Sequence, residues 1–166
     1  MIDSLEKINI DFEKNYQAIF NAPKLTQKYL NKRSDKFDQI IISEFKRRKL
    51  ENDFAIVALG GYGRQELFPS SDIDLSIIQL SKKSKKIEDV KNFIGWLWTL
   101  NVKIGHSVRT FKDINKITKS DLKEFTSYLS HRVIYCKEDN ISQLNLSLKK
   151  ISNNWNKKKF FKSKKI

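Results

Sequence analysis

The chain has 166 residues, and 39% of them are hydrophobic, which is enough for one ordinary domain core but not for two complete domains. Its formal net charge of +14 would suit a polyanionic partner, but eight of the lysines fall within residues 149–166 with no acid among them, as in a solvated chain end. The single cysteine, Cys136, excludes an intramolecular disulfide and a thiolate metal cluster. Because neither a signal-peptide pattern nor about 18 consecutive apolar residues occur, we expect a cytoplasmic protein with no membrane partner, and we do not favour nucleic acid.

The first fifty residues predict an N-terminal helical arm. Apolar residues recur at helical spacing over 3–20 and over 25–50, with charged residues between them. Pro23 separates the two segments at a position that suits the first turn of a helix. The second helix is expected to carry its apolar residues on one face: Leu30, Phe37, Ile41 and Phe45.

Two strands are predicted after the arm. The run FAIVAL, residues 54–59, is apolar and uncharged, and DIDLSIIQL, residues 72–80, alternates before it becomes apolar. A glycine loop and a Pro-Ser-Ser turn join them. Farther along, the spacing of apolar residues predicts a helix over 87–100, and VKIGHSV predicts a third strand over 102–108.

The last part of the chain is predicted to be helical. Asp121 followed by Glu124 is typical of a helix start in which each side chain accepts a hydrogen bond from a free backbone N–H. The segment LKEFTSYLSHRVIYC continues this helix to residue 136, and another helix is expected over 141–155. Helices and strands in this order predict an α+β fold.

Asp72 and Asp74 are the strongest chemical signal in the sequence. Residues two apart on a strand point to the same face, with Cα atoms about 6.5 to 7 Å apart. Two carboxylates there repel one another unless a cation lies between them, and Mg²⁺ suits such a pair because it keeps water and phosphate oxygens as further ligands. The alternative is a strand start whose aspartates simply face solvent.

The loop in front of these aspartates carries Gly60, Gly61, Gly63 and Arg64. Glycines let backbone N–H groups approach phosphate oxygens closely, and an arginine adds a bidentate contact. Taken alone, the glycines would indicate only a tight turn. Combined with the aspartates, they predict that a triphosphate cradle and a metal site share one edge of the sheet.

The segments GGYGRQELFPSSDIDL and LWTLNVKIGHSVRT resemble the DNA polymerase beta-like nucleotidyltransferase superfamily. More narrowly, they are similar to the N-terminal nucleotidyltransferase domain of the bacterial PII uridylyltransferase/uridylyl-removing enzyme, over roughly residues 50–136. The resemblance implies a small mixed sheet, with a helical arm at 1–50 and a nucleotidyltransferase core at 51–136. Residues 137–166 would form a C-terminal helix and a basic tail, truncated relative to the family.

The resemblance also implies a reaction, the transfer of UMP from UTP to a tyrosine of the PII nitrogen-regulatory protein with release of pyrophosphate. At the matching positions, Gly60 and Gly61 would hold the triphosphate, with Gly63 in the same nucleotide-binding turn. Asp72 and Asp74 would be the catalytic residues and would hold Mg²⁺, or Mn²⁺ in its place. UTP and PII are then the substrate and the acceptor.

Two positions stay open at this point. Arg64 would be a secondary phosphate contact or, equally, an ion-pair partner of Glu66. The superfamily commonly adds a third carboxylate on a later strand, but Lys103 stands there, so either two carboxylates suffice or another residue supplies the base. His106 is a candidate for that base, for a nucleotide contact or for a structural histidine. The polar residues of this predicted strand segment include His106, Ser107 and Arg109. Since side chains alternate along a strand, only some of these three can face the substrate.

Several alternatives to this function remain. Nothing after residue 136 resembles the family's hydrolase domain or its glutamine-sensing ACT domains, so we expect neither activity from this chain. The chain would then be a fragment, a truncated product or a stand-alone transferase. The alternatives are a related nucleotidyltransferase with another acceptor, an inactive remnant that binds nucleotide, or an RNA-binding module in which aromatic residues of the basic tail stack on bases: Trp155, Phe160 and Phe161.

Overall fold

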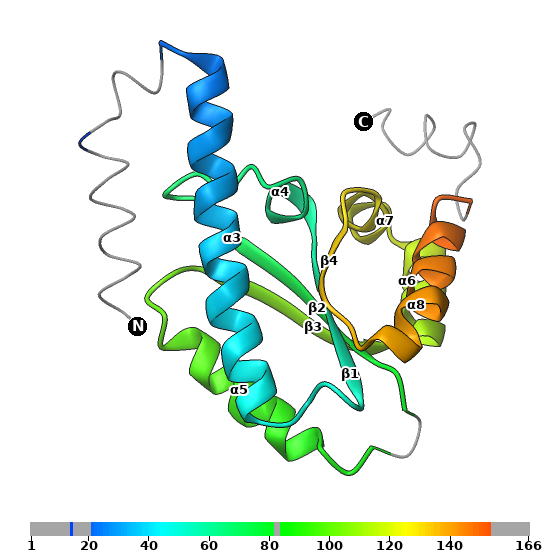
Figure 1. The fold of residues 1–166 in the computed structure, drawn as a ribbon. Helices are drawn as coiled ribbons and strands as arrows, with labels where there is room; N and C mark the ends of the chain where they lie inside the picture. Colours follow the sequence, from blue (N-terminus) through cyan, green and yellow to red (C-terminus); the bar gives the residue numbers. More distant parts are fainter. Residues whose placement is uncertain (1–13, 15–20, 82–83, 154–166) are drawn as a thin grey trace.

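A computed structural model of the chain describes residues 14, 21–81 and 84–153 (Figure 1). The elements follow in this order: α3 (Pro23–Arg47), β1 (Phe54–Ala58), α4 (Gly60–Gly63), β2 (Ile73–Gln79), α5 (Ile87–Trp98), β3 (Ile104–Thr110), α6 (Phe111–Ser120), α7 (Leu122–Leu129), β4 (Arg132–Tyr135) and α8 (Glu138–Ile151). This order confirms the predicted α+β class. The helix expected over 3–20 and the aromatic residues of the basic tail lie outside the described residues.

The sheet has four strands in the order β3-β2-β1-β4 and is mixed, as predicted. β1 pairs antiparallel with both β2 and β4, whereas β2 and β3 are parallel and are joined through α5. A parallel pair needs such a crossover connection, which explains the helix between these two strands. All five residues of β1 are buried, because this inner strand is covered on both faces.

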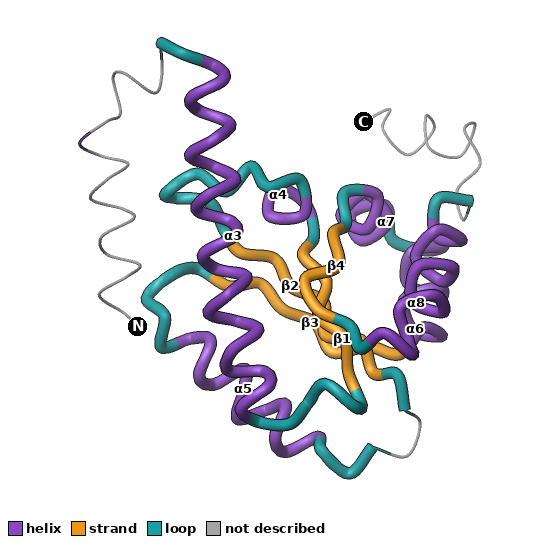
Figure 2. Tube along the Cα trace, in the orientation of Figure 1, coloured by secondary structure: helices purple, strands orange, loops and turns teal. Residues whose placement is uncertain are grey.

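Helices cover both faces of the sheet (Figure 2). On one face, apolar side chains of α3 and α5 pack with Ile73, Leu75 and Ile77 of β2 in one core cluster. On the other face, residues of α6, α7 and α8 pack with Ile78 of β2 in a second cluster. Strand alternation therefore sends successive residues of β2 to opposite layers.

The long helix α3 belongs to the first of these layers. It begins with Pro23 in its first turn, and Phe37, Ile41 and Phe45 are fully buried against the sheet. The apolar spacing read from the sequence thus gives the correct buried face. The boundaries predicted at residues 50/51 and 136/137 stay predictions.

The prediction of one continuous helix over 122–136 is wrong. α7 ends at Leu129, and Arg132–Tyr135 forms the edge strand β4, which pairs with β1. The run of Val133, Ile134 and Tyr135 has β-branched and aromatic side chains that favour a strand once a neighbour is available. That neighbour is β1, far away in the sequence, so the local helical spacing was misleading.

Helix α6 was not predicted from the sequence. It begins with a capping box in which the Thr110 hydroxyl accepts a hydrogen bond from Asp113 N–H and the Asp113 carboxylate accepts one from Thr110 N–H. This helix leads directly from β3 into α7, and it therefore helps to place α7 over the sheet (Figure 1).

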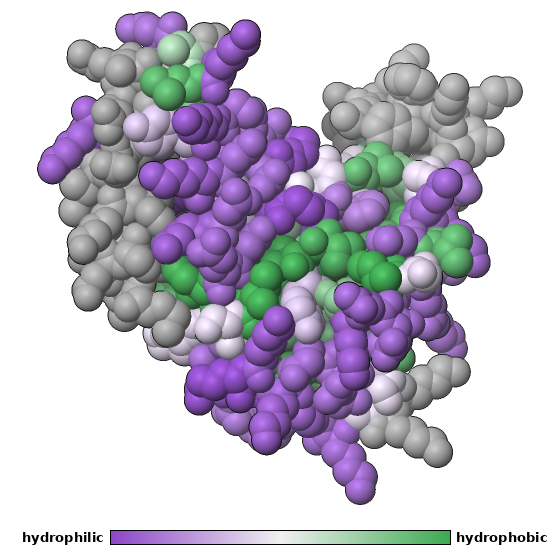
Figure 3. All heavy atoms as spheres, in the orientation of Figure 1, coloured by the Kyte–Doolittle hydropathy of each residue, from purple (hydrophilic) through white to green (hydrophobic). Residues whose placement is uncertain are grey.

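The surface is mostly hydrophilic over α3, and a band of hydrophobic residues crosses the same face between α3 and α8 (Figure 3). All four residues of the edge strand β4 are partly buried. Among the described helices, none has the length and apolar character that a crossing of the bilayer requires.

Candidate active site

Both predicted catalytic aspartates line one pocket of about 390 Å³. Asp72 immediately precedes β2, and Asp74 is its second residue, so strand alternation places them on the same side. The pocket lies where β2, β3 and α7 meet, and these residues line it: Leu59, Asp72, Asp74, Leu75, Gly105, His106, Ser107, Arg109, Lys123, Glu124 and Ser127.

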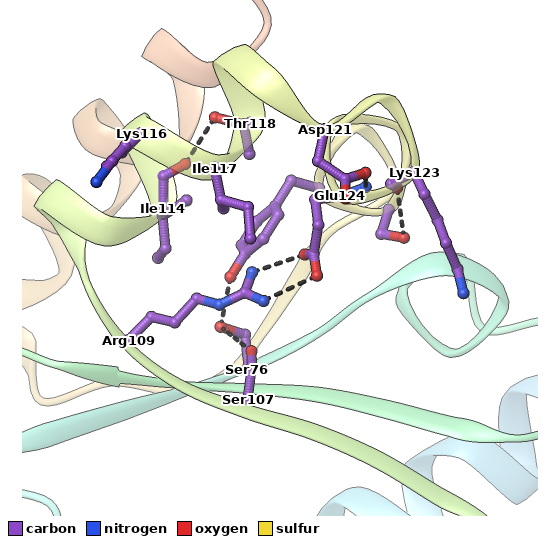
Figure 4. A network of polar contacts seen from close by, with 12 residues as sticks. Ser76, Ser107, Arg109, Ile114, Lys116, Ile117, Thr118, Asp121, Lys123 and Glu124 are labelled. Carbon is purple, nitrogen blue, oxygen red and sulfur yellow. Dashed lines mark hydrogen bonds and ion pairs between the residues drawn. The ribbon is translucent and has the colours of Figure 1, made fainter.

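The wall of the pocket rests on a polar network between the sheet and α7 (Figure 4). The hydroxyl groups of Ser76 and Tyr128 share a buried hydrogen bond of 2.7 Å, and Ser107 lies 3.5 Å from Ser76. Arg109 extends from β3 and meets the Glu124 carboxylate with two hydrogen bonds, of 2.6 and 2.8 Å. These contacts fix α7 over the aspartates.

The electrostatics of the pocket disfavour the negative charge of Asp74. Its partial removal from water and the charge of Asp72 raise the pKa of Asp74, with a smaller contribution from Glu124, while Lys123 acts in the opposite direction. A divalent cation between the two aspartates would relieve this repulsion. In the part of the chain that the structure describes, no group of three or more His, Cys, Asp or Glu side chains could hold a metal ion. Two carboxylates fit Mg²⁺ nevertheless, because it retains water and phosphate ligands.

The glycine turn lies beside Asp74, as the sequence predicted. Leu59 N–H donates to the Asp74 carbonyl oxygen at 2.9 Å, and a Cβ added to Gly60 would lie 3.6 Å from Asp74 Oδ2. Gly60 has a φ of 56°, which favours glycine. Among the described residues, no backbone hydrogen bond outside the helices and strands uses the N–H of Gly60 or Gly61 as donor, and the first residues of a helix have no acceptor within it. These two donors are therefore available to a ligand.

Gly63 and Arg64 have structural contacts of their own. A Cβ on Gly63 would overlap the carbonyl oxygen of Ser130, so glycine is required there for close packing. Arg64 donates to Glu66 at 2.7 Å and to the Ser130 hydroxyl at 3.2 Å. The pairing with Glu66 is one of the two interpretations left open for Arg64. The nucleotide-binding roles of Gly63 and Arg64 stay predictions.

The polar residues of β3 divide between the two faces of the sheet, as alternation predicted. Ser107 and Arg109 belong to the network under α7, whereas His106 is paired in register with Leu75, a residue of the opposite core. The imidazole of His106 makes an edge contact with Trp98, with ring centroids 5.5 Å apart. His106 lines the pocket, but its ring lies against α5, and its role in nucleotide binding stays a prediction.

Glu124 is the site residue that sequence reasoning missed. Its spacing from Asp121 predicts a reciprocal helix cap, and half of that prediction is confirmed, because Asp121 accepts a hydrogen bond from Glu124 N–H at 3.0 Å. The Glu124 side chain instead turns toward Arg109 and the pocket. Lys103 lies just before β3, and the third carboxylate among the residues that line this pocket is Glu124 of α7.

Comparison with known proteins shows which enzymes this chain resembles in sequence. It is 34% identical over 120 residues to the bifunctional uridylyltransferase/uridylyl-removing enzyme of Chromobacterium violaceum. The aligned region covers 72% of this chain and 14% of that enzyme. It is 32% identical over 148 residues to the enzyme of the same name from Pseudomonas aeruginosa. This aligned region covers 87% of this chain and 16% of that enzyme. This chain is a homologue of one part of these enzymes.

A third bifunctional uridylyltransferase/uridylyl-removing enzyme, from Vibrio atlanticus, is 40% identical over 111 residues, 66% of this chain and 13% of that enzyme. The chain therefore spans between 13% and 16% of the length of these relatives. No family model matches it. The relatives are named as uridylyltransferase/uridylyl-removing enzymes, so they belong to a family of transferases.

Proposed function

We propose that the pocket transfers UMP from UTP to a tyrosine of the PII nitrogen-regulatory protein. The observation that carries the proposal is the placement of Gly60 beside Asp74, where the turn after β1 meets the carboxylates of β2. A phosphate-binding turn next to a pair of carboxylates suits metal-dependent phosphoryl chemistry. The names of the relatives support uridylyl transfer in particular.

In this proposal, Asp72 and Asp74 hold Mg²⁺, or Mn²⁺ in its place. When bound, the cation would neutralise the charge that develops on the phosphate oxygens and on the departing pyrophosphate. The free N–H groups of Gly60 and Gly61 bind the triphosphate. Lys123, a pocket-lining cation close enough to Asp74 to affect its charge, adds a further contact for the phosphates.

The reaction is an in-line displacement at the α-phosphorus of UTP. The oxygen of the acceptor hydroxyl forms a bond to this phosphorus, while the bond from phosphorus to the bridging oxygen breaks and pyrophosphate leaves with that electron pair. The hydroxyl proton passes to Glu124. Among the described residues that line the pocket, Glu124 is the carboxylate that is not one of the two proposed metal ligands. Arg109 orients this carboxylate through its two hydrogen bonds.

The proposal is tested by incubating the chain with PII protein, Mg²⁺ and UTP or ATP labelled at the α-phosphate. Label that appears on PII from UTP, much less from ATP, and not in the presence of EDTA is the expected result. Label transferred only to a different protein would replace PII as the acceptor but retain the chemistry. Absence of any transfer, together with absence of metal-dependent nucleotide binding, contradicts the proposal.

Replacing Gly105 with alanine is predicted to disturb the site through Asp74. A Cβ at Gly105 would overlap Asp74 Oδ1, the end of a side chain that can move away. We expect Gly105→Ala to lower the transfer rate by roughly 10- to 100-fold, because small displacements of reacting groups are costly. The thermal midpoint should fall by less than about 4 °C. An unchanged rate would mean that the position of the Asp74 carboxylate does not matter.

A further inference from the structure

A polar contact outside the pocket joins three distant segments of the chain. The hydroxyl of Tyr62, in the glycine turn α4, donates to Asp38 Oδ1 of helix α3 at 2.5 Å. Arg132, the first residue of β4, donates to both carboxylate oxygens of Asp38. None of these residues belongs to the described lining of the pocket. Any effect that they have on a ligand is therefore exerted through the turn.

Burial and charge make this contact strong. Tyr62 is 1% exposed, and the side chains of Asp38 and Arg132 are 14% and 24% exposed. Burial and the charge of Asp38 raise the pKa of Tyr62, so its phenol stays protonated and continues to donate. Burial acts to lower the pKa of Arg132, but the hydrogen bond and the charge of Asp38 outweigh it, and the net pKa is raised. Charge-assisted hydrogen bonds with little access to water are stronger than exposed ones.

Arg132 also contacts Tyr62 directly. The Arg132 guanidinium lies over the Tyr62 ring, 5.4 Å from its centroid, and donates to the Tyr62 carbonyl oxygen at 3.4 Å. The next residue, Gly63, packs against the carbonyl of Ser130. Helix α4 is only four residues long, and a single helical turn is not stable by itself. Its position is thus imposed by α3, β4 and the connection between α7 and β4.

We propose that Asp38 is a positioning residue that, through Tyr62 and Arg132, fixes the Gly60–Gly61 turn beside Asp74 and so sets the affinity for the nucleotide. Gly60 and Tyr62 are two residues apart in one short turn, so a shift of the Tyr62 ring is transmitted to the glycine N–H groups. This inference rests on the proposed function for its ligand, a nucleoside triphosphate. It gives α3 a role in binding beyond its packing against the sheet.

The test uses Tyr62→Phe, which removes one hydroxyl and leaves the buried ring in place, and Asp38→Asn. We expect each variant to raise both the dissociation constant and the KM for UTP with Mg²⁺ by about tenfold, the size of effect typical of a lost hydrogen bond to a charged group. The kcat should change by less than about threefold, because the Asp72 and Asp74 carboxylates are untouched. In the double variant, the loss of UTP binding free energy should be less than the sum of the losses in the two single variants, since both substitutions weaken the contact between Tyr62 and Asp38.

Asp35→Asn is the matched control. Asp35 lies on the same helix and accepts a hydrogen bond of 2.8 Å from Gln65, but this pair is exposed. Its charge contributes less than that of Asp38 to the raised pKa of Arg132. We expect it to change the dissociation constant for UTP by less than about twofold. Equal weakening by Asp35→Asn and Tyr62→Phe would overturn the assignment of the effect to Asp38.

Hydrogen exchange separates this inference from the proposed function. In Tyr62→Phe, amides of residues 59–66 should exchange at least about threefold faster than in the wild type, while those of β1 keep their protection. Unchanged exchange in the turn, or equal acceleration in β1, would overturn the inference whether or not UTP binds. If the wild type binds no UTP while Tyr62→Phe still shows the faster local exchange, the proposed function is contradicted and the positioning contact is supported.

Discussion

Replacing Asp74 with asparagine is expected to lower the rate of nucleotidyl transfer by at least about 100-fold, because the variant loses a charge that holds the cation at the reacting phosphates. Asparagine has nearly the same size and keeps one oxygen, so the pocket should retain its shape. The measurement is the initial rate of label transfer from UTP at saturating Mg²⁺. A rate within about threefold of the wild type would remove Asp74 from the mechanism.

The same variant should not be less stable. The pKa of Asp74 is raised in the folded protein, so the folded state disfavours its ionised form, and this group destabilises the fold as the pH rises through its unfolded and then its folded pKa. At neutral pH the loss of the charge in Asp74→Asn therefore leaves the thermal midpoint unchanged or higher. Asp89→Asn, on the exposed face of the first turn of α5, is the control and should keep full activity. Loss of activity together with a marked fall in the midpoint would indicate damage to the fold.

Replacing Gly63 with alanine is expected to cost about 3 kcal/mol in the free energy of unfolding. The added Cβ would overlap the Ser130 carbonyl and approach the carbonyl oxygen of Ala58 to 3.0 Å, and backbone atoms cannot move aside as a side-chain end can. For a chain of this size the thermal midpoint should fall by roughly 10 °C. Urea unfolding followed by circular dichroism measures the change directly.

Gly95→Ala provides the matched control for this prediction. Gly95 lies inside helix α5, and a Cβ there would meet no atom within 4 Å. Alanine at an open helical position should stabilise the protein by about 0.5 to 1 kcal/mol. If Gly63→Ala keeps wild-type stability but binds UTP weakly, the glycine serves the nucleotide rather than the packing against Ser130.

The elements that the sequence predicted well have patterns that depend on their own residues. The uncharged run at Phe54–Ala58 became the inner strand, and the helical spacing around Phe37 and Phe45 gave the buried face of α3. The pairing of a glycine turn with Asp74 was also predictable, because both follow from a short motif on neighbouring strands. Local patterns of this kind need no knowledge of distant partners.

The features that the sequence did not predict depend on partners far along the chain. Val133 and Ile134 form a strand because β1 offers an edge, which no local spacing reveals. Glu124 faces Arg109, which lies on another element, so its role as a cap was an equally good local interpretation. Asp38 has no signal in the sequence at all, because its partners Tyr62 and Arg132 lie 24 and 94 residues away. Such contacts are set by tertiary packing.

Calorimetric titration of the wild-type chain with UTP in the presence of Mg²⁺, repeated with EDTA and with the Asp72→Asn/Asp74→Asn double variant, tests whether the two aspartates bind the metal and the nucleotide. We expect the wild type to bind UTP with Mg²⁺, and we expect both EDTA and the double substitution to weaken this binding at least about tenfold. This measurement requires no acceptor protein. Binding of equal strength in all three titrations would contradict the assignment of the two aspartates to a metal and nucleotide site.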